Sequence, residues 1–324
     1  MKLDALNYFI CKRCDQPSLS IVNTENKEVN DAILQCNSCA AQYTVKNGIP
    51  RFAEEYNYAT SFGFQWNMHK KTQLDSFTGH PVSRDRLFGV TRWPKKMTDQ
   101  VILEAGSGAG RFTEILLETG ATIYSFDYSS AVDANWANNG NKPNLNLFQA
   151  DIFNIPLRKK SFDKVLCLGV IQHTPDPEKA FQSLVQYVRP GGELVVDVYS
   201  KKLTALLQWK YVLRPLTKRT SKSTLYRIIE SITPILLPAS ILLRRVGGRF
   251  GSRLMPIVEY SNLNLPYDLN KQWAILDTFD MYSPEHDHPQ SLSTVKRWFR
   301  EAEFREIYVS YGPNGVVGRG KRPG

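Results

Sequence analysis

The feature that most constrains the fold is an apolar strand that leads directly into a glycine-rich turn and a helix. Residues 101–105 read Val-Ile-Leu-Glu-Ala, the next five read Gly-Ser-Gly-Ala-Gly, and apolar residues recur at helical spacing from Phe112. Glycines at such a turn let the backbone approach a ligand closely, because no Cβ stands in the way. Arg111 occupies the place where a dinucleotide-binding fold has its third glycine, so the turn predicts a ligand site that departs from the dinucleotide pattern.

The alternation of strand and helix continues along the chain. It predicts further strands at residues 122–126, 145–149, 162–168, 193–199, 304–310 and 315–319, and helices at 177–188 and 293–302. Strands that alternate with helices favour a parallel sheet with ligands at the carboxyl ends of its strands. Asp127 follows the second strand, 19 residues after Gly108, where a carboxylate can accept both hydroxyls of a ribose.

The run from residue 101 to residue 199 resembles the class I S-adenosylmethionine-dependent methyltransferases. The resemblance implies an α/β fold with a seven-stranded, Rossmann-like sheet and S-adenosyl-L-methionine as the cofactor. This cofactor carries an activated methyl, so the protein need only hold the acceptor in line and, where required, take a proton. The residues that match the family's cofactor site, and that we expect to bind it, are Glu104, Gly106, Gly108, Gly110, Asp127, Tyr128, Asp151, Ile152, Leu168 and Gly169.

Four of the five cysteines form two closely spaced pairs. Cys11, Cys14, Cys36 and Cys39 read C-x2-C, 21 residues, C-x2-C, a spacing that lets four thiolates share one tetrahedral Zn(II). A disulfide framework is the rival interpretation, but residues 1–10 do not read as a secretory signal. Four thiolates leave no open coordination position, so the predicted metal is structural; a ribbon that has lost its metal is the remaining alternative.

This stretch, with its tail at residues 43–52, resembles the Trm112-like zinc ribbons that are fused to or partnered with methyltransferases. The resemblance implies a small β domain that packs or presents substrate. We therefore divide the chain into a ribbon at 1–55, a methyltransferase core at 56–200 and 291–324, and a helical lid or insert at 201–290. Phe62, Phe64 and Trp66 either pack between ribbon and sheet or line the cofactor pocket.

The insert contains the whole charge imbalance of the protein. The net charge is +10, and residues 201–260 hold twelve Lys or Arg against two acidic residues. Apolar residues at helical spacing favour a lid packed over the pocket. Contact with an anionic membrane surface, for a lipid-linked acceptor, and binding of RNA phosphates are the two alternatives. The sequence contains no run of about 18 uncharged apolar residues, so it predicts no membrane-spanning helix. We therefore expect a cytoplasmic protein, with membrane contact only through this insert.

Four residues are candidates for catalysis: His173, Asp280, Tyr282 and His288. His173 follows the fourth strand and is either a general base or part of the pocket floor. Residues 277–288 are polar, aromatic and rich in ionisable groups, and we expect one or two acceptor contacts there and no metal. Cys167 lies in an apolar strand without a basic neighbour, which indicates packing and not nucleophilic chemistry.

The predicted activity is methyl transfer to a small-molecule, saccharide or lipid-linked acceptor, at oxygen. A methyltransferase acting on an rRNA or tRNA base, of the guanine-N1 type, is the enzyme alternative, since that type also carries an N-terminal zinc module. A degenerate methyltransferase that serves as a scaffold is the non-enzyme alternative, and the intact glycines and carboxylates argue against it.

Overall fold

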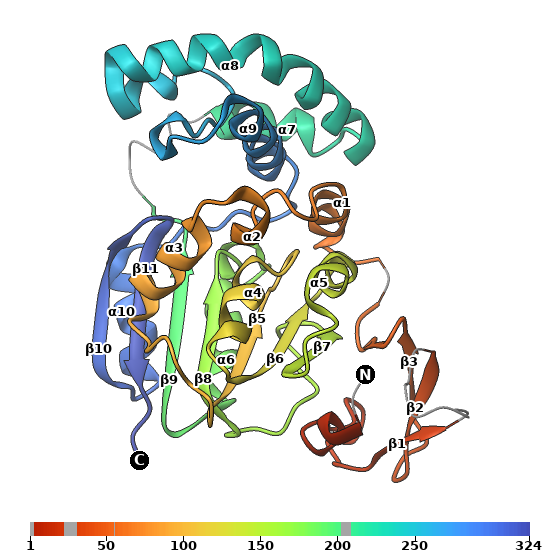
Figure 1. The fold of residues 1–324 in the computed structure, drawn as a ribbon. Helices are drawn as coiled ribbons and strands as arrows, with labels where there is room; N and C mark the ends of the chain where they lie inside the picture. The colour runs from red at the N-terminus through yellow and green to blue at the C-terminus, as the bar shows by residue number, and fades with distance from the viewer. Residues whose placement is uncertain (1–2, 23–30, 55, 202–208) are drawn as a thin grey trace.

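The computed structural model describes residues 3–22, 31–54, 56–201 and 209–324. Three parts are visible in Figure 1: a small ribbon at the N-terminus, a central sheet flanked by helices, and a layer of helices over one end of the sheet. The sheet and its flanking helices lie between the other two parts.

The central sheet has seven strands in the order β10-β11-β9-β8-β5-β6-β7. Strands β5 to β9 are parallel; β11 pairs with β9 in antiparallel orientation, and β10 pairs antiparallel with β11, so only β11 runs against the other strands. The strands are β5 (Val101–Ala105), β6 (Thr122–Asp127), β7 (Leu145–Gln149), β8 (Phe162–Leu168), β9 (Val188–Val198), β10 (Arg305–Gly312) and β11 (Gly315–Lys321). The predicted fold class is confirmed; β9 begins five residues earlier than expected because Val188 already pairs with Phe162.

Helices cover both faces of the sheet. Side chains alternate along each strand, so Leu103 of β5 belongs to one hydrophobic cluster and its neighbour Ile102 to another. The first cluster includes residues of α6 (Pro177–Val185) and α10 (Leu292–Glu301). The second includes residues of α3 (Val82–Thr91), α4 (Arg111–Glu118) and α5 (Ala131–Asn139). The remaining elements of the core are α1 (Thr60–Met68), α2 (Asp75–Thr78) and the 3₁₀ turn η2 (Ile171–His173).

The N-terminal ribbon is a four-stranded antiparallel sheet that docks on the edge strand β7. It follows the 3₁₀ turn η1 (Leu3–Asn7) and comprises β1 (Leu19–Val22), β2 (Ala32–Cys36), β3 (Gln42–Lys46) and β4 (Ile49–Pro50). The amide of Phe52 donates to the carbonyl of Gln149 over 2.8 Å, and Phe9 and Phe52 share a hydrophobic cluster with Phe148 of β7. The ribbon therefore covers a sheet edge that would otherwise present unpaired backbone groups.

The segment between β9 and α10 forms the helical layer, with α7 (Trp209–Thr217), α8 (Lys222–Ser252), the turn η4 (Ser261–Leu263) and α9 (Tyr267–Tyr282). The layer has hydrophobic clusters of its own, formed mainly between α8 and α9. The two ends of the segment meet, because the amide of Lys201 donates to the carbonyl of Gln290 (2.9 Å) and the amide of Gln290 to that of Tyr199 (2.7 Å).

One stretch of α8, Lys222–Gly248, is long and apolar enough to cross a membrane by length and composition alone, with a third of its most apolar window buried. The sequence predicted no membrane-spanning helix, because it contains no run of about 18 apolar residues without a charge. Core helices of soluble proteins pass the same test.

Candidate functional site

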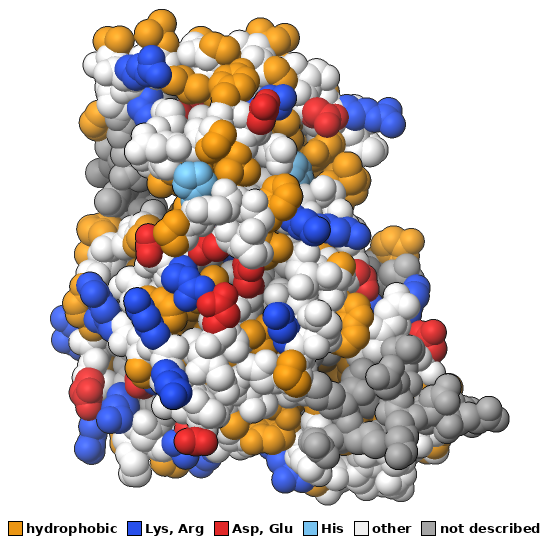
Figure 2. All heavy atoms as spheres, viewed as in Figure 1, with side chains coloured by type: hydrophobic (Ala, Val, Ile, Leu, Met, Phe, Trp, Pro, Cys, Tyr) orange, Lys and Arg blue, Asp and Glu red, His pale blue; other side chains and the backbone are white. Residues whose placement is uncertain are grey.

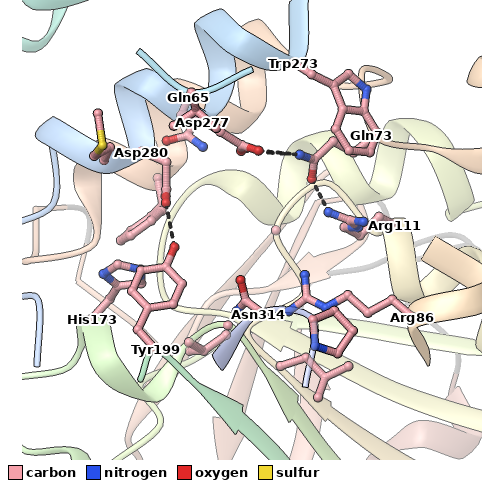
Figure 3. A pocket seen from close by; sticks show the side chains of 18 of the residues that line it. Gln65, Gln73, Arg86, Arg111, His173, Tyr199, Trp273, Asp277, Asp280 and Asn314 are labelled. Carbon is pink, nitrogen blue, oxygen red and sulfur yellow. Dashed lines mark hydrogen bonds between the residues drawn. The ribbon is translucent and has the colours of Figure 1, made fainter. Parts of the chain in front are cut away.

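A cavity of about 1470 Å³ lies between the carboxyl ends of the parallel strands and the helical layer. Its floor is formed by the glycine-rich turn after β5 and by the ends of β6 and β8, and its roof by residues of α7, α8 and α9. Figure 3 shows side chains from both sides of the cavity pointing toward one another. This is the edge of the sheet at which the strand pattern predicts a ligand.

The turn after β5 has the backbone shape that requires glycine. Gly106 has φ +76°, and a Cβ at this position would lie 2.2 Å from a methyl group of Val170. The amide of Gly108 donates to Asp127 Oδ2 over 3.0 Å, while the amide and hydroxyl of Ser129 donate to Oδ1 over 2.9 and 2.7 Å. Burial raises the pKa of Asp127 above its usual value, and these hydrogen bonds offset only part of that rise. The Asp127 carboxylate is thus held in a fixed orientation on the cavity wall.

Seven of the ten residues expected at the cofactor line this cavity: Gly106, Gly108, Asp127, Tyr128, Ile152, Leu168 and Gly169. The structure brings them together from four separate stretches of the chain. Because Gly106 and Gly108 leave room for a ligand close to the backbone and Asp127 offers a carboxylate beside them, this end of the cavity fits the nucleoside of S-adenosylmethionine.

The other three expected residues lie behind the cavity wall. Glu104 is fully buried, where its Oε2 accepts hydrogen bonds from Thr113 (2.5 Å) and Ser125 (2.8 Å), and burial raises its pKa to about 7. Gly110 is the N-cap of α4, and a Cβ there would lie 2.2 Å from Asn135 Oδ1.

Asp151 is half-buried beside the lining residue Ile152, and its Oδ1 accepts from the amide of Phe153 over 3.0 Å. All three residues support the turn or the wall in this structure and do not form its surface.

Two carboxylates of α9 face the cavity at the opposite end. Asp277 and Asp280 are three residues apart, so they lie on the same side of the helix. Tyr199 donates to Asp280 Oδ2 over 3.0 Å, and Tyr260 donates to Asp277. Burial raises the pKa of each carboxyl to about 6, and for Asp277 the charge of Asp280 adds to the effect. Both groups are ionised at neutral pH and hold a proton in mildly acidic solution.

His173 lies on the cavity wall between aromatic rings. Its ring is 4.9 Å from that of Phe62 and 5.2 Å from that of Tyr199, measured between centroids. Burial lowers the pKa of His173 to about 4, so the ring is neutral at pH 7. Nδ1 lies 3.1 Å from the carbonyl oxygen of His286, which accepts only, so Nδ1 carries the proton and Nε2 the lone pair.

The other two catalytic candidates are not on the cavity wall. Tyr282 is buried in the helical layer, where its hydroxyl donates to the carbonyl of Pro256 over 2.8 Å. His288 is exposed, and its backbone amide donates to the carbonyl of Gln172. Of the aromatic residues of α1, Phe62 and Trp66 line the cavity, whereas Phe64 packs against Tyr226 and Phe279 of the helical layer.

Sequence patterns did not identify several polar residues that the fold brings to this site. Arg111 donates to Gln73, whose amide donates to Asp277 over 3.3 Å, so that α4, the segment before α2 and α9 are joined (Figure 3). Gln65 is 1% exposed, lines the cavity, and neither of its amide atoms has a hydrogen-bond partner in the part of the chain that the structure describes. Only the position of Arg111, in place of a third glycine, was a signal in the sequence.

The four ribbon cysteines converge at the end of β2 and the loops beside it. Their Sγ atoms lie within 4.8 Å of one another, with Cys11 and Cys39 separated by 3.5 Å and Cys14 and Cys36 by 3.6 Å. Thiolates around zinc, at about 2.3 Å from the metal, are about 3.8 Å apart. Tyr43 and Ser18 lie within hydrogen-bond distance of Cys11 and Cys36 (3.3 and 3.2 Å). The four thiols therefore fit one tetrahedral zinc ion with supporting hydrogen bonds.

Comparison with known proteins agrees with this geometry. A family model described as a methyltransferase domain matches residues 103–196. The ubiquinone biosynthesis O-methyltransferase of Coxiella burnetii is 24% identical over 182 residues, which cover 54% of this chain and 73% of that protein. The tRNA U34 carboxymethyltransferase of Ruthia magnifica is 32% identical over 110 residues, which cover 32% of this chain and 34% of that protein.

Among solved structures, the complex of the Haloferax volcanii Trm112 methyltransferase activator with a methyltransferase aligns with a TM-score of 0.46 at 12% identity, over 82% of this chain and 98% of that one. The matched domain coincides with the strands and turns that form the floor of the cavity. From its sheet order, its glycine turn and the family match, the chain is a class I S-adenosylmethionine-dependent methyltransferase with an N-terminal four-cysteine ribbon.

Proposed function

We propose that this enzyme methylates a hydroxyl group of a small or lipid-linked acceptor, and that Asp280 takes the hydroxyl proton. The observation that carries the proposal is a buried carboxylate on the cavity wall, fixed by Tyr199 and with a pKa of about 6. A general base works best when its pKa lies near the working pH. A relative whose printed name is an O-methyltransferase supports transfer to oxygen.

Asp280 is a better base than His173. A group with a pKa of about 6 binds a proton about a hundredfold more tightly than one with a pKa of about 4. His173 instead serves to hold Tyr199 in place, since its ring packs edge-on against the tyrosine that donates to Asp280. In this proposal His173 is a positioning residue.

The residues that would hold the cofactor are the seven on the cavity wall, from Gly106 to Gly169. When bound, S-adenosylmethionine supplies a methyl group already activated by a positively charged sulfur. The chain then has to orient the acceptor, exclude water and remove one proton. Gln65, buried and unpartnered within the described chain, offers an amide to orient the acceptor's polar group.

The cations of residues 201–260 support a small acceptor over RNA. Several of them are used inside the protein: Lys210 pairs with Asp287 (2.8 Å), Arg214 donates to the carbonyl of Pro284 (2.7 Å) and Arg244 pairs with Glu259. Recognition of nucleic acid needs cations directed outward to phosphates. Part of the excess positive charge that made RNA binding an alternative is therefore engaged in contacts within the roof of the cavity.

The test is methyl transfer from labelled S-adenosylmethionine to a panel of phenols with prenyl tails of increasing length. Asp280→Asn, which keeps the size of the side chain, should lower kcat by about 10²- to 10⁴-fold and leave S-adenosylhomocysteine binding intact. Tyr282→Phe, on the same helix but off the cavity, is the matched control and should keep full turnover. A product methylated at ring carbon, or an Asp280→Asn enzyme as active as the parent, would contradict the proposal.

A further inference from the structure

Helix α8 presents a row of large apolar side chains to solvent. Ile228, Ile235, Leu242 and Val246 are between 48% and 83% exposed. Their spacing of seven, seven and four residues places them on one side of a helix with 3.6 residues per turn. The opposite side of α8 packs against α9, so the exposed row faces away from the protein.

The middle of α8 also lacks charge. Residues 231–243 contain no ionisable side chain, and only Thr233, Leu237 and Ser240 among them are buried. A surface helix of a soluble protein normally turns charged residues to water. Figure 2 shows hydrophobic side chains gathered along the edge of the molecule where Figure 1 places α8.

Helix α7 likewise directs its apolar side chains to solvent and its cations into the protein. Its cations Lys210 and Arg214 are buried, where they contact Asp287 and the carbonyl of Pro284. Its apolar residues Val212 and Leu216 are each 67% exposed. Charges directed inward and apolar groups directed outward are the reverse of what contact with water favours.

Cations flank this apolar surface. Lys218 and Arg219 follow α7, and Arg227 and Arg245 lie on α8; all four are exposed. Glu230 is the sole acidic residue in the sequence from 209 to 254. An apolar face bordered by cations matches the two parts of an anionic bilayer surface, its acyl boundary and its headgroups.

The cavity reaches this surface. Trp209 and Phe250 line the cavity and are also exposed, by 40% and 73%. The indole nitrogen of Trp209 donates to the carbonyl of Leu254, itself exposed, over 3.1 Å. An amphiphile with its tail in a bilayer could therefore enter the cavity headgroup first without its tail crossing water.

We infer that the outer face of α7 and α8, which we call the docking face, binds an anionic membrane surface and admits an acceptor with an apolar tail. The docking face comprises Val212, Leu216, Ile228, Ile235, Leu242 and Val246 with the flanking Lys218, Arg219, Arg227 and Arg245. Phe250 follows the break in helical geometry at Gly248 and is not counted in it. Helix α8 lies on the membrane and does not cross it, because its inner side forms part of the helical layer. The membrane contact stands independently, and the nature of the acceptor rests on the proposed function.

A second copy of the chain is the competing occupant. A twofold contact through this face would place the four cations of one copy against those of the other, and like charges brought together oppose association. Charge complementarity thus favours the membrane, and the mass of the protein in solution distinguishes the two.

The experiment is co-sedimentation of the intact protein with phosphatidylcholine vesicles prepared with and without phosphatidylglycerol. We expect binding that requires the anionic lipid and weakens with salt. Ile235→Ser with Leu242→Ser should reduce the partition coefficient at least about tenfold. Arg227→Ala and Arg245→Ala should each reduce it about fivefold, which corresponds to about 1 kcal/mol per cation. Tyr308→Ser, which alters an exposed apolar residue of β10, is the matched control and should bind like the parent.

Circular dichroism and the melting temperature of each variant verify that the helical layer is folded. No binding to anionic vesicles, or a dimer in solution that Leu242→Ser converts to a monomer, overturns the inference. Turnover of water-soluble phenols without vesicle binding would contradict this inference alone. Vesicle binding without methyl transfer to any hydroxyl would contradict the proposed function alone.

Discussion

At the scale of single residues, Asp280 determines how the enzyme should respond to pH. Its pKa is about 6 because burial penalises the charged carboxylate, partly offset by the hydrogen bond from Tyr199. A base acts only when ionised, so kcat should be constant above about pH 7 and fall tenfold per pH unit below pH 6. Initial rates between pH 5 and 8, with circular dichroism at each pH to verify folding, provide the measurement. If His173 were the base, its pKa of about 4 would keep the rate constant down to pH 5; such a profile would refute the role of Asp280.

At the scale of elements, the ribbon is tied to the sheet by packing as well as by metal. Phe52 and Phe148 share one hydrophobic cluster, and Arg51 pairs with Asp133 of α5 across the junction. We expect about one zinc per chain by elemental analysis, and Cys36→Ser should remove most of it and lower the melting temperature, because metal binding contributes folding free energy. Cys167→Ala is the control: that residue is buried in β8, so the variant should lose stability but keep its zinc. A zinc content that is unchanged in Cys36→Ser, or absent from the parent protein, would exclude the metal site.

At the scale of the whole molecule, the helical layer is built as a separable roof. Its ends meet through hydrogen bonds between Lys201, Gln290 and Tyr199, and its clusters are formed mainly within the layer. Replacing residues 203–287 by a short glycine linker should preserve S-adenosylhomocysteine binding, since the glycine turn and Asp127 belong to the sheet. Methyl transfer should disappear, because Asp280 and the roof are removed. Calorimetry and turnover measure the two effects, and full turnover in the shortened protein would show that the roof has no part in the reaction.

The sequence by itself determined the sheet, the glycine turn and the cysteine spacing, because each is a local pattern. Strand alternation depends on neighbouring residues, and Gly106 is required by the backbone conformation at its own position. The tertiary structure alone decided which ionisable groups share the cavity. Asp280 and Tyr282 stand two residues apart, yet the direction of each side chain on α9 places one on the cavity wall and the other in the layer. Likewise, the sequence shows Lys210 and Arg214 only as two of the twelve cations of residues 201–260, and the packing of α7 alone directs them inward. The exposed apolar row of α8 is also visible only in the structure. Burial, partners and orientation arise from contacts between distant segments, and no local pattern encodes them.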